Sequence, residues 1–186
     1  MNIGKLFEAQ IFKSAPDYAK MYKLPDSAQS FGGCSNLRFS KKNPFDYILW
    51  DSNYRVLYAL ELKTVEGKSI SFERTPDKKK EIHYHQIQGL TEWNEYNGIV
   101  CGFIIEFRKI ETTIFLHISD FNKLITLITK TSFNLNDLIK NDISYVVIPQ
   151  EKSRTRYTYD IDHMLKIESE KELIREELKW WRKKEK

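Results

Sequence analysis

The fold is decided by Pro44-Phe-Asp-Tyr-Ile-Leu-Trp50, a turn at Asp51-Ser-Asn53, and Arg55-Val-Leu-Tyr-Ala-Leu-Glu-Leu-Lys63. Both flanking runs are rich in β-branched and aromatic residues, which predicts two strands joined in a hairpin. A hairpin returns the end of its second strand to the start of its first, so we expect Glu61 to lie near Asp46. Residues two apart on a strand share a face, which places Lys63 beside Glu61.

Two carboxylates and a lysine therefore converge at one end of the predicted hairpin. Carboxylates a few ångströms apart repel unless a cation lies between them, and Mg²⁺ takes oxygen ligands while keeping positions for water and phosphate. The lysine would orient or deprotonate the attacking water and offset charge that develops on phosphorus. Glu-x-Lys alone is common as an ion pair on a solvent-facing strand, and its position opposite Asp46 is what favours a catalytic interpretation.

A helix from about Lys79 to Tyr96 supplies a further polar group. Gln86 lies in the middle of its apolar stripe, which consists of Ile82, Gly89, Leu90 and Trp93. A buried amide needs a partner, and the alternatives are a backbone carbonyl or a metal ion with its bound water. His85 lies at the edge of the stripe, a position typical of a packed or phosphate-facing histidine.

The rest of the chain alternates between helical and strand patterns. An amphipathic first helix carries Gln10 within its apolar stripe and Glu8 at the rim of that stripe. The apolar run from Ile99 to Phe107 predicts a central strand covered on both faces. We further expect a helix capped by Ser119. A final helix has one apolar stripe that packs on the protein's own core or, as the alternative, forms a dimer interface; the stripe is made of Ile167, Ile174, Leu178 and Trp181. The other expected elements are short strands at 69–72, 112–118, 145–148 and 154–159 and a short helix at 134–140. This pattern predicts an α/β protein with one mixed sheet and helices on its faces.

Length and composition favour a single soluble domain. The chain has 186 residues, of which 41% are hydrophobic and 30% charged, and no run approaches the roughly 18 apolar residues of a membrane span. Two cysteines give no disulfide framework or zinc signature, and no secretory signal is visible, so we expect a cytoplasmic protein without a membrane partner. The net charge of +4 decides nothing by itself, but Lys41 and Lys42 form one of several basic clusters that suit phosphate contacts.

The order of these elements resembles the PD-(D/E)xK nuclease superfamily. Pro44-Phe-Asp46 and Glu61-Leu-Lys63 stand for its two half-motifs, between a helix with Glu8 and a helix with Gln86. Within the superfamily the sequence is most similar to RecU-type Holliday junction resolvases and their phage-encoded relatives, over about the first 120 residues. The resemblance implies a restriction-endonuclease-like fold, a mixed β-sheet flanked by helices. It implies one nuclease domain over residues 1–186, with its core at about 1–130 and a C-terminal helical extension at about 160–186.

The same resemblance implies an activity and a site. The protein would be a Mg²⁺- or Mn²⁺-dependent homodimer that resolves four-way junctions by paired symmetric nicks, in the cytoplasm of a bacterium or of a phage-infected host. The metal ligands would be Asp46, Glu61 and Gln86; Lys63 would stabilise the transition state; and the DNA contacts would be Lys41, Lys42 and His85. Bacterial members have a threonine where this chain has Pro44, and Glu8 or water would fill that catalytic position.

Three interpretations of the function remain open. The first is the junction resolvase. The second is another PD-(D/E)xK nuclease that acts on branched or linear duplex DNA. The third is a non-catalytic recombination or DNA-binding module, against which the clustered carboxylates argue because they repel phosphate.

Overall fold

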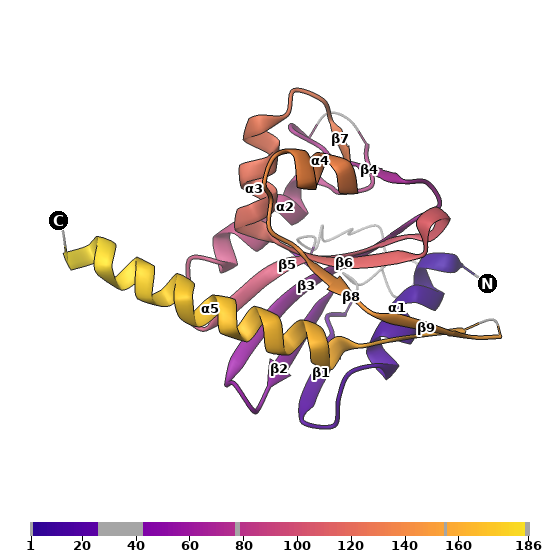
Figure 1. Ribbon diagram of the computed structural model, residues 1–186, viewed down its shortest axis with the longest axis horizontal. Coiled ribbons are helices and arrows are strands. Elements are labelled where there is room, and N and C mark those ends of the chain that lie inside the picture. Colours follow the sequence, from indigo (N-terminus) through magenta and orange to yellow (C-terminus); the bar gives the residue numbers. More distant parts are fainter. Residues whose placement is uncertain (1, 26–42, 77–78, 155, 185–186) are drawn as a thin grey trace, which may run out of the picture.

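The structure, a computed structural model, describes residues 2–25, 43–76, 79–154 and 156–184, and the side chains of the last helix as far as Arg175. A six-stranded sheet forms the middle layer, and helices cover both of its faces (Figure 1). The predicted mixed α/β sheet flanked by helices is confirmed.

The strands of the central sheet run in the order β1-β2-β3-β5-β6-β8. Their bounds are β1 (Ala19–Lys23), β2 (Tyr47–Asp51), β3 (Val56–Val65), β5 (Ile99–Phe107), β6 (Thr112–His117) and β8 (Val146–Ile148). Only β3 and β5 pair in parallel, and the other neighbours are antiparallel. The other strands of the described residues form two small sheets. In one, β4 (Ser69–Ser71) pairs with β7 (Ser132–Asn134), and in the other, β9 (Gln150–Ser153) pairs with β10 (Arg156–Tyr159).

Helices on the two faces bury two separate cores. The helices are α1 (Ile3–Lys13), α2 (Tyr84–Trp93), α3 (Ile118–Leu127), α4 (Leu135–Lys140) and α5 (Ile161–Lys184), with a 3₁₀ turn η1 (Arg108–Ile110) after β5. Side chains of α2 and α3 pack with Ala59, Cys101 and Phe103 on one face of the sheet. Side chains of α1 and the start of α5 pack with Tyr58 and Leu60 on the other. Because β5 lies in the middle of the sheet, all its residues except Ile99 are buried.

Several expectations about single elements are wrong. No strand was expected between the first helix and Pro44, where β1 lies, and the strand expected at 69–72 joins β7 rather than the central sheet. The helix expected from Ser119 begins at Ile118, because the ring nitrogen Nδ1 of His117 accepts from the backbone N–H of Ser119 and so caps α3.

The last helix departs from its expected packing. Ile167 packs on the core beside α1, as expected, but the side chain of Ile174 is 59% exposed and does not. Figure 1 shows the reason: α5 lies along the sheet at its start and then projects beyond the body. Leu178 and Trp181, the other two residues of the expected stripe, have side chains outside the described part. Among the helices of the described residues, none is both long and apolar enough to cross a membrane.

Candidate active site

The β2–β3 hairpin brings Asp46 opposite Glu61. Tyr47 pairs with Leu60 in the antiparallel ladder, so the next pair outward is Asp46 with Glu61. The backbone N–H of Asp46 donates to the carbonyl of Leu60 over 3.2 Å, which continues the ladder to this point. The backbone N–H of Leu62 donates to Oδ2 of Asp46 over 3.4 Å and fixes that carboxyl beside β3. The proximity expected from the hairpin is therefore present.

Glu61 is the most deeply buried group of the site, with 1% of its side chain exposed. Its Oε1 lies 2.9 Å from Nζ of Lys63 and also accepts from Nε2 of Gln86. Its Oε2 is buried and has no hydrogen-bond donor among the residues that the structure describes. The carboxyl group of Asp46 lies next to that of Glu61. One buried carboxyl oxygen of Glu61 thus faces the carboxyl group of Asp46, and the two can share a hydrogen bond only while one of them is protonated.

Burial is the main cause of the shifted pKa values of these two carboxyl groups, and their charged neighbours modify it. Burial raises the pKa of Glu61 to about 8, the charge of Asp46 adds to the rise, and the ammonium of Lys63 opposes it. Burial also raises the pKa of Asp46, against the opposing effects of its interaction with Glu61 and of Lys63. Ionising both carboxyls is therefore unfavourable without a further positive charge between them.

Helix α2 reaches the site because of a close contact with the hairpin. A Cβ atom at Gly89 would lie 2.3 Å from Cβ of Pro44, so only glycine allows this approach. The contact places Gln86, one turn before Gly89, against Glu61. Gln86 thus lies on the buried face of the helix, as its position in the predicted apolar stripe indicated. Pro44, which cannot supply a side-chain oxygen, instead forms the surface on which α2 sits.

The amide of Gln86 has both of its ends engaged. Its nitrogen donates to Glu61, and its oxygen accepts from the backbone N–H of His83 over 2.9 Å, which closes the first turn of α2. The amide oxygen would bind a cation only if the amide turned over and released His83. In this arrangement Gln86 orients the carboxyl group of Glu61.

The N-terminus of α2 is held by an acid that the sequence analysis missed. Glu73 accepts from the backbone N–H of Tyr84 over 2.8 Å, and its Oε1 lies 2.9 Å from Nδ1 of His83. These bonds lower the pKa of Glu73 to about 2. By fixing the start of α2, Glu73 positions Gln86. Its sequence signal was weak because it lies in a charged segment with no periodicity.

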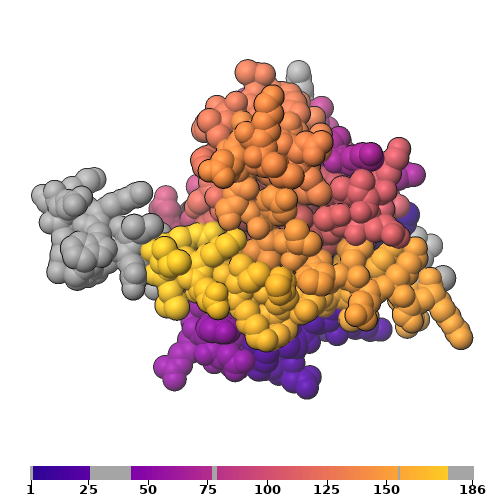
Figure 2. Space-filling model, viewed as in Figure 1, coloured from indigo at the N-terminus to yellow at the C-terminus, as the bar shows by residue number. Residues whose placement is uncertain are grey.

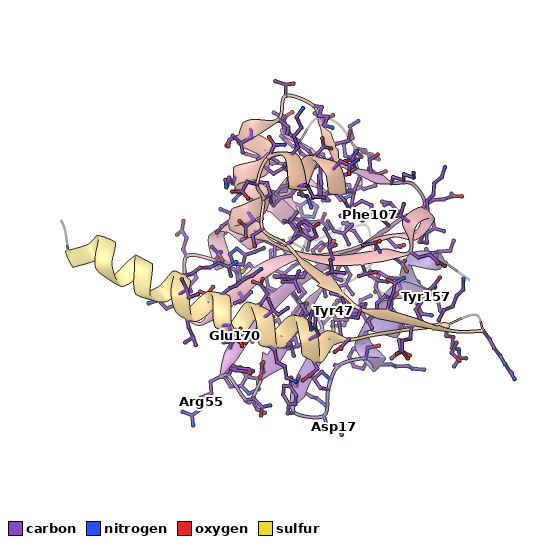
Figure 3. All side chains as sticks on the ribbon, in the orientation of Figure 1. Asp17, Tyr47, Arg55, Phe107, Tyr157 and Glu170 are labelled. Carbon is purple, nitrogen blue, oxygen red and sulfur yellow. The ribbon has the colours of Figure 1, made fainter. Side chains whose placement is uncertain are left out.

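Glu8 lies at the rim of the site and is already paired. Lys23 on β1 approaches its Oε2 to 2.5 Å, and the hydroxyl of Tyr47 donates to the same oxygen over 3.0 Å. Figure 3 labels Tyr47 in the middle of the molecule. The charge of Glu8 contributes to the raised pKa of Asp46, which places it close to that carboxyl. Glu8 was predicted from the sequence, whereas its partners Lys23 and Tyr47 were not.

The three expected DNA contacts are only partly described. The ring of His85 stacks on that of His83, with centroids 5.5 Å apart and planes 14° apart, at the start of α2. This position next to Gln86 is compatible with a phosphate contact. Lys41 and Lys42 lie outside the described residues.

The donor set suits a hard divalent cation. In the described part of the chain, no group of three or more His, Cys, Asp or Glu side chains is arranged to hold a metal ion. Mg²⁺ does not need such a group, because it keeps several waters and binds through one or two carboxylates. Asp46 and Glu61 offer two carboxyl groups, and the unsatisfied Oε2 of Glu61 is the kind of atom that such an ion completes. The residues present therefore fit the group that the resemblance implies.

The chain is similar to known proteins in both sequence and structure. No protein-family model matches it. Among solved structures, it is similar to the Holliday junction resolvase Hjc of Archaeoglobus fulgidus, with 10% identity and a TM-score of 0.43 over 72% of this chain and 90% of that one. It is 31% identical over 177 residues to the SPbeta prophage-derived uncharacterized protein YotM of Bacillus subtilis, which covers 88% of this chain and 85% of that protein. The chain belongs to the family of this prophage-derived protein.

Proposed function

We propose that this protein is a metal-dependent, structure-specific DNA endonuclease that resolves four-way junctions by paired symmetric nicks. The observation that carries the proposal is the buried Oε2 of Glu61, which has no donor in the described part of the chain and lies beside the carboxyl group of Asp46. A binding module for DNA has no use for two adjacent buried carboxyl groups, since they repel phosphate. A metal-dependent phosphodiesterase uses such a pair to hold a cation.

Each residue of the site has a separate task in this proposal. Asp46 and Glu61 would hold Mg²⁺, or Mn²⁺, which when bound supplies a Lewis acid for the scissile phosphate. Lys63, 2.9 Å from Glu61, orients the attacking water and offsets the charge that develops on the phosphate oxygens. Gln86 keeps the carboxyl of Glu61 in place, and its oxygen becomes a further ligand if the amide turns over.

The remaining residues have proposed roles in catalysis and in DNA binding. Glu8, held by Lys23 and Tyr47, takes the catalytic position that Pro44 leaves without an oxygen, either directly or through water. His85, at the start of α2, contacts a phosphate of the bound DNA, as do Lys41 and Lys42.

Paired nicks require two sites that face one junction, so we also propose a homodimer. A C₂ dimer matches the symmetry of the substrate. The N-terminal third offers exposed aromatic side chains for such an interface: Tyr22 is 58% and Trp50 is 42% exposed, on neighbouring strands at the edge of the sheet. Sedimentation at micromolar concentration should give about twice the chain mass of 22.2 kDa. A monomer that stays monomeric on junction DNA would contradict the dimer.

A panel of substrates tests the function. Purified protein is incubated with Mg²⁺ and equimolar four-way junction, Y-fork and linear duplex, and the products are mapped to single nucleotides. The proposal expects symmetric nicks in the junction and little cleavage of the other two. Equal cleavage of all three would favour a general PD-(D/E)xK nuclease. Binding without cleavage of any would favour the non-catalytic module.

A further inference from the structure

Glu73 is a buried acid that the proposed chemistry does not use. Its side chain is 7% exposed. The carboxylate accepts from the backbone N–H of Tyr84 over 2.8 Å and from that of Lys80 over 3.2 Å, and its Oε1 lies 2.9 Å from Nδ1 of His83. All of these partners belong to residues 80–84, where α2 begins. A carboxylate that is bonded on both oxygens to one short segment fixes that segment in place.

Glu73 supplies a cap to α2 from outside the helix. His83 is the N-cap residue, a position where Ser, Thr, Asp or Asn usually provides the acceptor for the first turn. The acceptor for Tyr84, the first helical residue, instead comes from Glu73. The backbone beside Glu73 is paired independently of its side chain: its N–H donates to the carbonyl of Ile82 over 2.9 Å, and the N–H of Ile82 donates to the carbonyl of Ser71 over 3.0 Å. Loss of the carboxylate should therefore loosen the first turn of α2 and leave the chain folded.

The first turn of α2 matters to the candidate active site because Gln86 is its third residue. Helix ends fray, and α2 has only 10 residues. The amide of Gln86 is bonded at both ends, its oxygen to the backbone N–H of His83 and its nitrogen to Oε1 of Glu61. One end of this amide thus depends on the turn that Glu73 caps, and the other end orients a carboxyl group of the site. When the turn frays, the carboxyl of Glu61 loses its fixed orientation.

We propose that Glu73 is a positioning residue of the metal site, which it reaches through the first turn of α2 and Gln86. It touches neither the cation nor the DNA, and it sets the affinity for the cation by keeping Glu61 aligned. Groups that orient a metal ligand from behind commonly change the metal affinity by about 10–100-fold. The proposal rests on the proposed function, since it takes Asp46 and Glu61 as the carboxyls that hold a divalent cation.

Metal binding in the absence of DNA tests this role. The probe is Mn²⁺, whose free concentration is read from its electron paramagnetic resonance signal while the full chain is titrated, well below the melting temperature of every variant. Glu73→Ala should raise the dissociation constant for Mn²⁺ about tenfold. Glu73→Gln, which keeps an oxygen for the N–H of Tyr84, should recover most of the affinity. An unchanged dissociation constant in Glu73→Ala would overturn the proposal.

A cap on another helix separates positioning from a general loss of stability. Asp160 accepts from the backbone N–H of His163 over 2.9 Å and so caps the start of α5. Figure 2 shows α5, in yellow, across the front of the molecule, and its first residues pack on the face of the sheet opposite to α2. Asp160→Ala should lower the melting temperature, as Glu73→Ala does, yet bind Mn²⁺ like the wild type. Mn²⁺ binding weakened by the same factor in both variants would overturn the proposal.

A double-mutant cycle shows whether Glu73 acts through Gln86. Gln86→Ala alone should raise the dissociation constant for Mn²⁺. Adding Glu73→Ala to it should cause little further change, because the group through which Glu73 acts has been removed. Fold changes that multiply would mean that Glu73 affects the metal by another route, which overturns the proposal.

The outcomes distinguish the role of Glu73 from the wider function. A wild type that binds Mn²⁺ and cleaves junctions, with an unchanged dissociation constant in Glu73→Ala, overturns the role of Glu73 alone. A wild type that binds no Mn²⁺ overturns the metal site of the proposed function as well.

Discussion

Replacing Glu61 by glutamine should stabilise the metal-free protein, although it removes a residue of the candidate active site. Burial raises the pKa of Glu61 from its usual 4.5 to about 8, so the folded chain binds this proton more tightly than the unfolded chain does. Between these two values the unfolded chain carries fewer protons, and the stability of the wild type falls as the pH rises. The loss begins near pH 4.5 and is complete near pH 8.

The size of the effect follows from the shift. One pKa unit corresponds to about 1.36 kcal/mol, so the 2.5 units between 4.5 and 7 correspond to a cost on the order of 3 kcal/mol at pH 7. Glutamine avoids this cost because it does not titrate. Its oxygen can accept from Lys63 and Gln86, as Oε1 of Glu61 does, and its nitrogen can donate to Asp46. For a chain of this length the melting temperature should rise by roughly 10 °C.

Urea unfolding in EDTA, followed by circular dichroism from pH 4.5 to pH 8, measures the difference. The gain of Glu61→Gln should be near zero at the acid end and grow as the pH rises. The exposed Glu66, changed to Gln, is the control for the loss of one carboxyl group outside the site. Mg²⁺ should stabilise the wild type more than Glu61→Gln, because it binds the deprotonated carboxyl. A Glu61→Gln protein that is less stable at pH 7, or whose gain is independent of pH, would refute this account of the site.

Three further substitutions test the other residues of the site. Lys63→Ala should lower the single-turnover cleavage rate by roughly 10²-fold or more with little change in metal affinity. A cleavage rate that returns to the wild-type value at high Mg²⁺ would show that Lys63 only helps the site to bind metal. Gln86→Ala should raise the Mg²⁺ concentration that gives half-maximal cleavage. A lower melting temperature with the same metal dependence would show that Gln86 only holds the helix. Gly89→Ala should lower the free energy of unfolding by about 1–3 kcal/mol, since its Cβ meets Pro44 at 2.3 Å. It should also slow cleavage, because α2 is displaced. An unchanged free energy of unfolding in calorimetry would show that this contact does not position α2.

The sequence predicted the parts of the site that depend on local geometry. Glu61 and Lys63 share a face because they are two apart on one strand, and Asp46 lies opposite because a short turn fixes the register of the hairpin. Gln86 was found because a polar residue interrupts a helical stripe. Each of these relations is determined by neighbouring residues.

Contacts between distant segments were not predictable in the same way. Glu8 meets Lys23 from a separate strand and Tyr47 from 39 residues away, and nothing in the local pattern joins them. β1 was missed because Met21 is its only fully buried residue, so the alternation that marks a strand is weak. The exposed Ile174 shows a different limit. A helical stripe predicts which face of a helix is apolar, but that face is buried only as far as the rest of the protein extends beneath the helix.

A cleavage assay of Asp46→Ala shows whether Asp46 and Glu61 hold the metal ion that the proposed nuclease needs. Asp46 lies next to the unsatisfied oxygen of Glu61, and its loss should leave the proposed metal site with one carboxyl. Wild-type protein and the variant are compared on a labelled four-way junction in Mg²⁺ and in EDTA, with binding measured in parallel. We expect Mg²⁺-dependent nicks by the wild type alone. The variant should bind the junction equally or more tightly, since a charge that repels phosphate has been removed. Cleavage by Asp46→Ala at the wild-type rate in Mg²⁺ would contradict this expectation.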